Sequence, residues 1–213
     1  EGVSRNRQRS FFKINLKVLI YFRYGLGLSK MIAKSAIIHS DVKIGKNAEI
    51  GEFVEIGVPP AGKKDGELTT EIGDNAIIRS HSVIYAGNKI GDNFVTGHFA
   101  LLRENNKIGN NVSVGSYSHV AFDCLIEDDV RIHTAAYIFE KSILRKGCWI
   151  GPGVMLANAK YPLSKRAKEF IVAPEIGERA KLGMSCVISP GIKIGRNALV
   201  GLGAIVTKDV PEN

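Results

Sequence analysis

The side chains in this sequence best suited to move a proton near neutral pH are its five histidines. His119 lies in the segment SHVAFDC with Asp123 four residues later, and His98 lies in TGHFALLREN, where we expect it at a corner next to the polar run at 103–105. A histidine whose tautomer is set by a carboxylate can act as a general base, and converging histidines can bind zinc. The polar run suits sugar hydroxyls or a phosphate. Which chemistry is available depends on the elements that position these residues.

A six-residue repeat supplies those elements. Hexads such as IGKNAE, IGDNFV and IGRNAL run over residues 38–61, 72–161 and 176–211, giving 25 in all. A short strand plus a tight corner uses about six residues. Glycine at the second place, often with Asn or Asp two residues later, suits corners with unusual backbone angles. The first place is aliphatic and the fifth is small or apolar, so both must point inward.

Two inward places and one corner per hexad build a three-sided prism with 18 residues per coil and parallel strands stacked about 4.8 Å apart. The sequence therefore predicts an all-β fold, a left-handed parallel β-helix of roughly eight coils over residues 32–213. Residues 62–71 and 162–175 leave the frame and should protrude as loops. Residues 1–31 are basic and do not follow the repeat; they predict a short helix packed against the rod, with a membrane-surface anchor as the alternative.

Composition narrows the class of protein. The net charge is +8, but the first 30 residues hold seven basic residues against Glu1, and no recognised nucleic-acid motif accompanies them, so no nucleic-acid partner is expected. The apolar run 14–28 contains Lys17 and Arg23, which argues against a secretory signal or a bilayer span. The cysteines lack a zinc-like spacing and occupy inward fifth places, which predicts core residues in a reducing cytoplasm. They are Cys124, Cys148 and Cys186.

Residues 18 apart stack on one another, so the frame also maps the outer faces. Two faces are mixed or polar, whereas the third is apolar and aromatic, and four of the five histidines fall in its hexads. Its outward residues are His81, Val83, Phe99, Leu101, Tyr117, His119, Ala135 and Tyr137. An apolar strip of this length would be a liability on a monomer, so other subunits should cover it. Asn88 and Asn106 point inward and predict a stacked amide ladder rather than a site.

The repeated [LIV]-G-x-x-x-x resembles the hexapeptide-repeat acyltransferases, and GRNALVGLGAIVTKDVP at 195–211 is similar to the final coils of their acetyl-coenzyme A users. This resemblance covers residues 32–213. It implies transfer of an acetyl group from acetyl-coenzyme A to an amine or hydroxyl, in a homotrimer with active sites between neighbouring subunits. SHVAFDC resembles HxxHDC of the acyltransferases of lipid A biosynthesis and HxxEH of bacterial sugar N-acetyltransferases. In both, the later histidine is the base, whereas this chain has Phe122 and Asp123 there.

Three roles for His119 stay open. It is the base, with Asp123 or a neighbouring-chain group setting its tautomer, or it orients the acceptor, or it packs in the trimer interface. His98 is the rival base. The expected catalytic residues are His119, His98 and Asp123, and the expected substrate-binding residues are His81, Arg103, Glu104, Asn105 and Tyr117.

For the cofactor, LANAKYP at 156–162 resembles the TNDxYP segment of amino-sugar acetyltransferases, with Ala159 in place of the acid. The resemblance implies pantetheine and acetyl contacts at this segment and contacts to pantetheine and the adenosine phosphates from the last coils; a solvated terminal lysine is the alternative for Lys208. The expected residues are Asn158, Lys160, Tyr161, Gly183, Gly201, Ala204 and Lys208. No metal is expected.

The leading hypothesis is an acetyl-coenzyme A dependent acetyltransferase acting on the amine of a nucleotide-linked amino sugar, in surface polysaccharide synthesis. The low pKa of a sugar amine makes a strong base dispensable, which favours N- over O-transfer. Three alternatives remain: a sugar O-acetyltransferase with His119 or His98 as base, a γ-type carbonic anhydrase-like zinc protein with histidines converging across a subunit boundary, and a non-catalytic assembly module.

Overall fold

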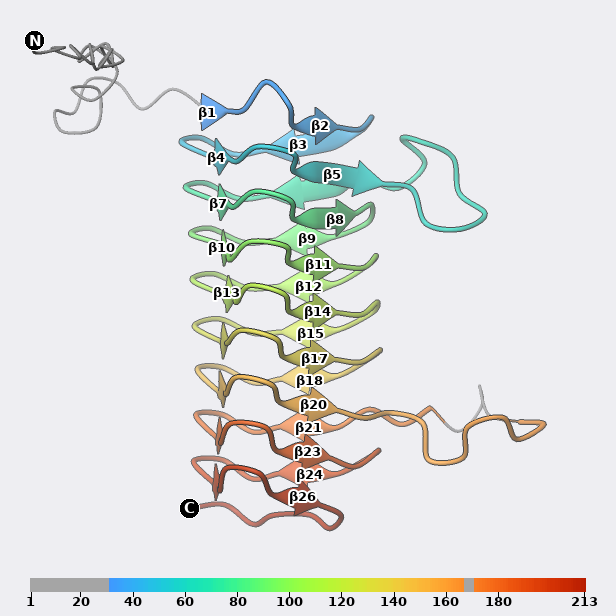
Figure 1. Ribbon diagram of the computed structural model, residues 1–213, viewed down its shortest axis with the longest axis vertical. Helices are drawn as coiled ribbons and strands as arrows, with labels where there is room; N and C mark the ends of the chain where they lie inside the picture. The colour runs from blue at the N-terminus through green and yellow to red at the C-terminus, as the bar shows by residue number, and fades with distance from the viewer. Residues whose placement is uncertain (1–30, 167–170) are drawn as a thin grey trace, which may run out of the picture.

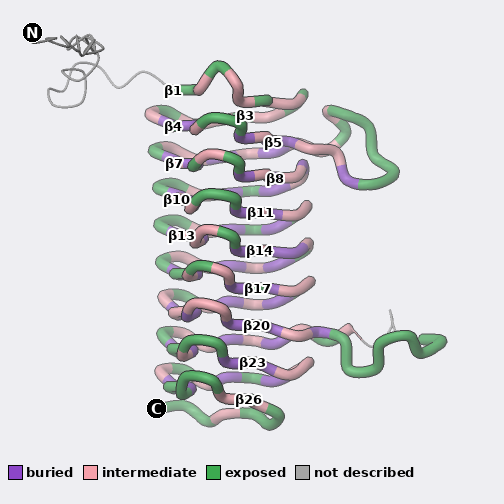
Figure 2. Tube along the Cα trace, viewed as in Figure 1, coloured by how far each residue is buried: buried purple, intermediate pink, exposed green. Residues whose placement is uncertain are grey.

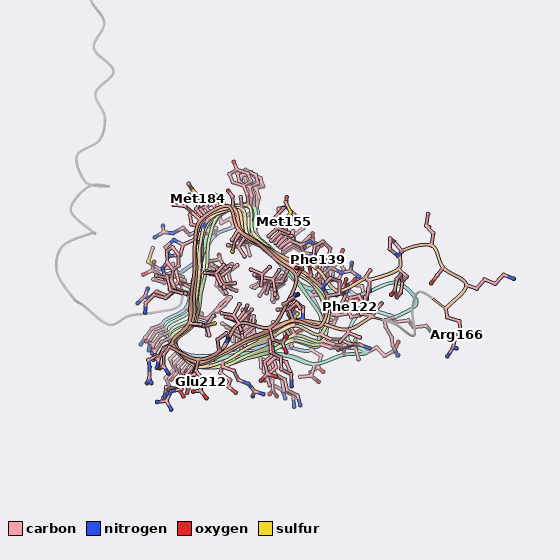
Figure 3. All side chains as sticks on the ribbon, turned by 90° about the horizontal axis from the view of Figure 1, so that it is seen from below. Phe122, Phe139, Met155, Arg166, Met184 and Glu212 are labelled. Atoms are coloured by element: carbon pink, nitrogen blue, oxygen red, sulfur yellow. The ribbon has the colours of Figure 1, made fainter. Side chains whose placement is uncertain are left out.

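The computed structural model describes residues 31–166 and 171–213, so the expectations for the first 30 residues lie outside the described part. The chain winds as a triangular rod of stacked coils (Figures 1 and 3), with 26 short strands and no helix in those two ranges. The strands form three parallel sheets, here called sheets A, B and C, and successive strands within a sheet follow one another from coil to coil. The predicted left-handed parallel β-helix is confirmed.

Sheet A consists of β1 (Met31–Ile32), β4 (Glu49–Ile50), β7 (Ile77–Ile78), β10 (Val95–Thr96), β13 (Ser113–Val114), β16 (Arg131–Ile132), β19 (Trp149–Ile150), β22 (Lys181–Leu182) and β25 (Leu199–Val200). Sheet B consists of β2 (Ile37–Ile38), β5 (Glu55–Val58), β8 (Val83–Tyr85), β11 (Leu101–Leu102), β14 (His119–Val120), β17 (Tyr137–Ile138), β20 (Met155–Leu156), β23 (Val187–Ile188) and β26 (Ile205–Val206). Sheet C consists of β3 (Val42–Ile44), β6 (Thr70–Ile72), β9 (Lys89–Ile90), β12 (Lys107–Ile108), β15 (Leu125–Ile126), β18 (Ile143–Leu144), β21 (Glu175–Ile176) and β24 (Lys193–Ile194).

The sheets hold nine, nine and eight strands, which is one strand more than the 25 counted hexads and makes nearly nine coils. The extra strand is β1, which begins at Met31, before the first counted hexad. We name the corners by the sheets they join: the AB corner, the BC corner and the CA corner.

The core runs along the axis of the rod, where the first and fifth hexad places meet (Figure 2). Its long aliphatic residues, such as Ile84 and Leu102, alternate with small ones, such as Ala100. The three cysteines are among the small buried residues, as predicted, and none is paired. Burial raises the pKa of the Cys124 and Cys148 thiols to about 12, so neither is a reactive thiolate near neutral pH.

The corners differ from the expectation in one respect. The left-handed backbone angle belongs to the fourth hexad place, with φ of 57° at both Asn93 and Asn111, and not to second-place glycines such as Gly183. A Cβ on Gly183 would lie 2.5 Å from the backbone nitrogen of Leu202 in the next coil. Second-place glycine is therefore required here by the close approach of successive coils and not by its own φ.

The inward amides form the predicted ladder. Asn106 accepts a hydrogen bond from the backbone N–H of Cys124 (2.8 Å) and donates to the carbonyl of Arg103 (2.8 Å), while its own N–H donates to Asn88 (3.0 Å). Because both amides are fully buried, these bonds satisfy backbone groups at the BC corner that no water can reach.

Two loops leave the rod at the BC corner and protrude on the same side (Figure 1). They span residues 59–69 and 157–174, so both begin before the predicted bounds of 62–71 and 162–175. Thr70 belongs to β6 and Glu175 to β21, because both pair with neighbouring coils. Over the two described ranges, no helix has the length and apolar character needed to cross a membrane.

Candidate active site

His119 points outward from β14 near the middle of sheet B. It lies in register between Leu101 and Tyr137, and its ring meets the Tyr137 ring edge-on at 6.3 Å. The side chain is half-buried, and within the described residues its Nε2 is buried without a hydrogen-bond partner. Burial, with a smaller contribution from Arg103, lowers the pKa of His119. The imidazole is therefore neutral near neutral pH and free to accept a proton at a buried nitrogen.

Arg103 lies beside His119 at the BC corner. Its guanidinium makes a two-point ion pair with Glu104, with Nε–Oε2 2.8 Å and Nη2–Oε1 2.9 Å, and it covers the Tyr85 ring at 4.8 Å. The bond to Glu104 raises the pKa of Arg103, so the cation is permanent. Arg103, Glu104 and the exposed Asn105 thus occupy one corner, as the sequence predicted.

Glu140 completes the polar cluster, and sequence reasoning missed it. Asn158, which is 6% exposed, donates a hydrogen bond to the Glu140 carboxylate, and the negative charge of Glu140 opposes the fall in the pKa of His119. Glu104, Glu140 and Asn158 share one position of the coil, since they lie 36 and 18 residues apart. That spacing is the signal that could have found Glu140.

Asp123 does not lie among the charged groups that act on the pKa of His119. It occupies the fourth place of the BC corner with φ 57° and is exposed. The carboxylate that influences the imidazole is that of Glu140. The tautomer-setting role of Asp123 stays a prediction.

The AB corner carries an aromatic stack. Phe53, His81, Phe99 and Tyr117 follow one another with ring centroids 5.1, 4.7 and 5.0 Å apart. Phe53, Phe99 and Tyr117 are exposed by 61%, 44% and 59%, which is far more than a packed core aromatic and leaves the outer face of the stack open. His81 and Tyr117 therefore belong to one apolar ridge beside the sheet B face.

His98 lies on that AB corner as well, where its Nδ1 is 2.8 Å from the hydroxyl of Ser80. It is exposed. Arg103 and its neighbours lie at the BC corner, at the other end of β11, so the sequence-based grouping of His98 with residues 103–105 was wrong. Four residues, 99–102, lie between His98 and Arg103, and the chain crosses sheet B over that stretch.

The expected cofactor residues fall at two corners of the same face. Lys160 has left the core as predicted and is exposed with Tyr161, its Nζ 5.6 Å from that ring. Gly183 and Gly201 occupy the AB corner in successive coils. Lys208 is exposed in the last coil at the BC side, and Ala204 is half-buried. Asn158 differs from the rest because its amide is already bonded to Glu140.

Between these corners, the sheet B face carries apolar side chains. Tyr137, Met155 and Ile205 are exposed on it, and Figure 3 labels Met155 on the outside of the rod. Hollows lie over sheet C, around Lys89 and Lys107, and over sheet A. The Nε2 of His119 is covered on this isolated face, so a substrate reaches it only if neighbouring side chains move.

As to metal chemistry, no three His, Cys, Asp or Glu side chains converge as ligands within residues 31–166 and 171–213 of a single chain. A zinc centre built from this chain would need ligands from a second subunit, as the carbonic anhydrase-like alternative supposes.

Comparison with known proteins shows which families the repeat resembles. The family described as the hexapeptide repeat of succinyl-transferase matches residues 175–208. A putative acetyltransferase of Schizosaccharomyces pombe is 38% identical over 68 residues, which is 30% of this chain and 33% of that protein. Galactoside O-acetyltransferases of Lactococcus lactis (37% over 67 residues; 30% and 32%) and Escherichia coli (38% over 68 residues; 30% and 34%) match similarly. The matched segment thus spans about a third of these relatives.

Among solved structures, an Arabidopsis UDP-N-acetylglucosamine acyltransferase superposes with a TM-score of 0.54 at 17% identity, covering 85% of this chain and 69% of that one. At that identity the likeness concerns the fold.

Proposed function

We propose that this hexapeptide-repeat chain, a left-handed β-helix related in sequence to acetyltransferases, transfers an acetyl group from acetyl-coenzyme A to a sugar. The observation that carries the proposal is His119: a neutral, half-buried imidazole with an unpartnered Nε2 on the sheet B face, beside a cluster of charged and amide groups. The match of residues 175–208 to succinyl-transferase repeats, and the match of a 67-residue segment to a galactoside O-acetyltransferase, support acyl transfer.

In this mechanism His119 is the general base. Its Nε2 takes the proton of the attacking amine or hydroxyl as that atom bonds to the acetyl carbonyl carbon. The carbon–sulfur bond then breaks, and His119 returns the proton to the departing sulfur. The carboxylate of Glu140 favours the imidazolium formed in between, whereas burial and, to a smaller extent, the charge of Arg103 lower the pKa of His119 and keep the resting ring neutral.

The leading acceptor is the amine of a nucleotide-linked amino sugar, in surface polysaccharide synthesis. Arg103, Glu104 and Asn105 offer donors and acceptors suited to sugar hydroxyls, and the two protruding loops flank their corner. A sugar hydroxyl is the second candidate acceptor, because two relatives are named galactoside O-acetyltransferases. The unpaired, buried cysteines suit a reducing compartment, and we place the reaction in the cytoplasm.

We further propose that the active protein is a homotrimer. The exposed aromatic ridge at the AB corner and the flat sheet B face need a cover, and a neighbouring subunit can supply both the cover and the missing wall of the site. It would also let cofactor groups from the two corners come from different chains. Acetyl-coenzyme A would be held by Gly183, Gly201, Tyr161, Lys160 and Lys208.

The test is acetyl-coenzyme A binding by calorimetry, with a thiol-release assay over nucleotide-linked amino sugars and galactosides. The matched variants are Gly201→Tyr, which fills an open corner where a Cβ meets nothing within 4 Å, and Lys107→Tyr on sheet C. We expect binding and release that only Gly201→Tyr abolishes. Absence of binding at millimolar cofactor, with no thiol release from any acceptor, would reject the proposal and favour a zinc protein or an assembly module. Zinc analysis of the same sample separates those two.

A further inference from the structure

Trp149, the one tryptophan of the chain, lies on a face that the proposed mechanism does not use. It points outward from β19 on sheet A, in register with Arg131 of β16 in one neighbouring coil and Lys181 of β22 in the other. The indole is half-buried, whereas both cationic residues are exposed. An aromatic plane is therefore held between two positive charges.

This arrangement lines a hollow of about 460 Å³, a size within the range of small-ligand sites. Two glycines, Gly147 and Gly183, belong to the lining and add no side chain to it. The complete lining is Asp129, Arg131, Gly147, Cys148, Trp149, Lys181, Gly183 and Leu199.

The hollow is lined by two positively charged side chains, Arg131 and Lys181. Neither Arg131 nor Lys181 makes an ion pair within the described parts of the chain. Asp129, the acid in the lining, already accepts a hydrogen bond from Asn111 (3.0 Å) and lies 3.8 Å from the ammonium of Lys146. An anionic group entering the hollow would thus meet two cations whose charge is not neutralised by the protein.

The ring of His133 packs against the indole of Trp149. The two rings lie 4.6 Å apart, tilted by 53°, and the indole stays half-buried. Burial and the charge of Arg131 lower the pKa of His133, which leaves it neutral. Arg131 also lines an adjoining hollow with Arg79 and Ser113, so the positive surface continues along sheet A.

We propose that Trp149, Arg131 and Lys181 form a nucleotide-binding site, in which the base stacks on the indole and a phosphate pairs with the two cations. A simple anion would not need the aromatic plane, and an uncharged aromatic ligand would leave the two cations unused. Base stacking and charge-assisted pairing are each strong enough to be measured separately. The inference rests on the proposed function, in which both substrates carry a nucleotide: the sugar acceptor or the adenosine bisphosphate of coenzyme A.

Because Trp149 is the sole tryptophan, its fluorescence reports binding directly. The intact chain is titrated with UDP, GDP and adenosine 3′,5′-bisphosphate, with uridine and inorganic phosphate as half-ligand controls, and calorimetry repeats each titration. We expect saturable quenching by at least one nucleotide, at least tenfold tighter than by either half-ligand. Preference for UDP or GDP identifies the acceptor as the source, whereas preference for the bisphosphate, with competition by coenzyme A, identifies the cofactor.

The variants are Arg131→Gln, Lys181→Gln and Trp149→Phe, with Lys89→Gln on sheet C as the matched control. Each of the first three should weaken nucleotide binding about tenfold or more, while the control leaves it unchanged. Binding to Trp149→Phe is measured by calorimetry, because this variant lacks the fluorescent residue. No saturable binding of any nucleotide at millimolar concentration, or equal weakening by Lys89→Gln, would overturn the inference. Thiol release without nucleotide binding at Trp149 would refute this site alone, whereas nucleotide binding without thiol release would refute the acetyltransferase alone.

Discussion

Two glycines of the AB corner, Gly183 and Gly201, allow the effect of a side chain on stability to be measured apart from its effect on ligand binding. They occupy equivalent places in successive coils. The test replaces each of them by alanine in a separate variant. A Cβ on Gly183 would lie 2.5 Å from Leu202 N and 2.7 Å from Gly201 C, both backbone atoms that cannot rotate away. A Cβ on Gly201 would meet nothing within 4 Å, and neither glycine has a positive φ.

Overpacking of a tight contact costs about 1–3 kcal/mol, so Gly183→Ala should lower the free energy of unfolding by that amount. Gly201→Ala should be neutral or stabilising by up to about 1 kcal/mol, because alanine restricts the unfolded chain. Urea denaturation followed by circular dichroism measures both. Equal stabilities for the two variants would refute the explanation that coil spacing requires the second-place glycine. A loss of acetyl-coenzyme A affinity in Gly201→Ala at unchanged stability would identify a ligand contact.

Three further predictions concern the ladder, the base and the assembly. Asn106→Ala leaves the buried N–H of Cys124 without its partner, whereas the Arg103 carbonyl keeps its bond from Asn88, so the free energy of unfolding should fall by about 1–3 kcal/mol in urea denaturation, against less than about 0.5 kcal/mol for exposed Lys107→Ala; an equal fall for the two variants would show that the ladder is not stabilising. Arg103→Gln removes a charge that lowers the pKa of His119, so the acidic limb of the pH–rate profile, where the base becomes protonated, should move to higher pH; an unmoved or lowered limb would contradict the assignment. Phe99→Asp inserts a charge into the exposed ridge and should convert trimers to monomers in light scattering, and an unchanged mass would show that the ridge is not an interface.

The fold was predictable because the six-residue repeat recurs in every coil. One aliphatic and one small residue per hexad fix the inward direction, and the same 18-residue stack then places His119, Leu101 and Tyr137 on one face. The loop bounds were harder to place. Pro59 and Pro60 fall within a hexad that matches the repeat in sequence. Proline lacks the backbone N–H that strand pairing needs, however, and the chain leaves the sheet there.

The candidate site was only partly predictable, for a geometric reason. Sequence distance suggested that Asp123 accompanies His119, yet consecutive residues diverge across a corner while residues 18 apart meet. Glu140 and Asn158 were therefore overlooked, although their spacing puts them in one stack. The bond between them depends on side-chain directions that the repeat does not specify, whereas His98 and Arg103 are separated because they lie at different corners of one coil.

The most direct test of the central claim is the rate of thiol release from acetyl-coenzyme A, with the best acceptor of the panel, for wild type, His119→Asn and His98→Asn. If His119 is the base, its replacement should lower kcat about 10²- to 10⁴-fold for a hydroxyl acceptor, with less loss for a sugar amine, and should abolish the acidic limb of the pH–rate profile. His98→Asn should stay within about threefold of wild type. A fully active His119→Asn enzyme with an unchanged pH profile would contradict the account.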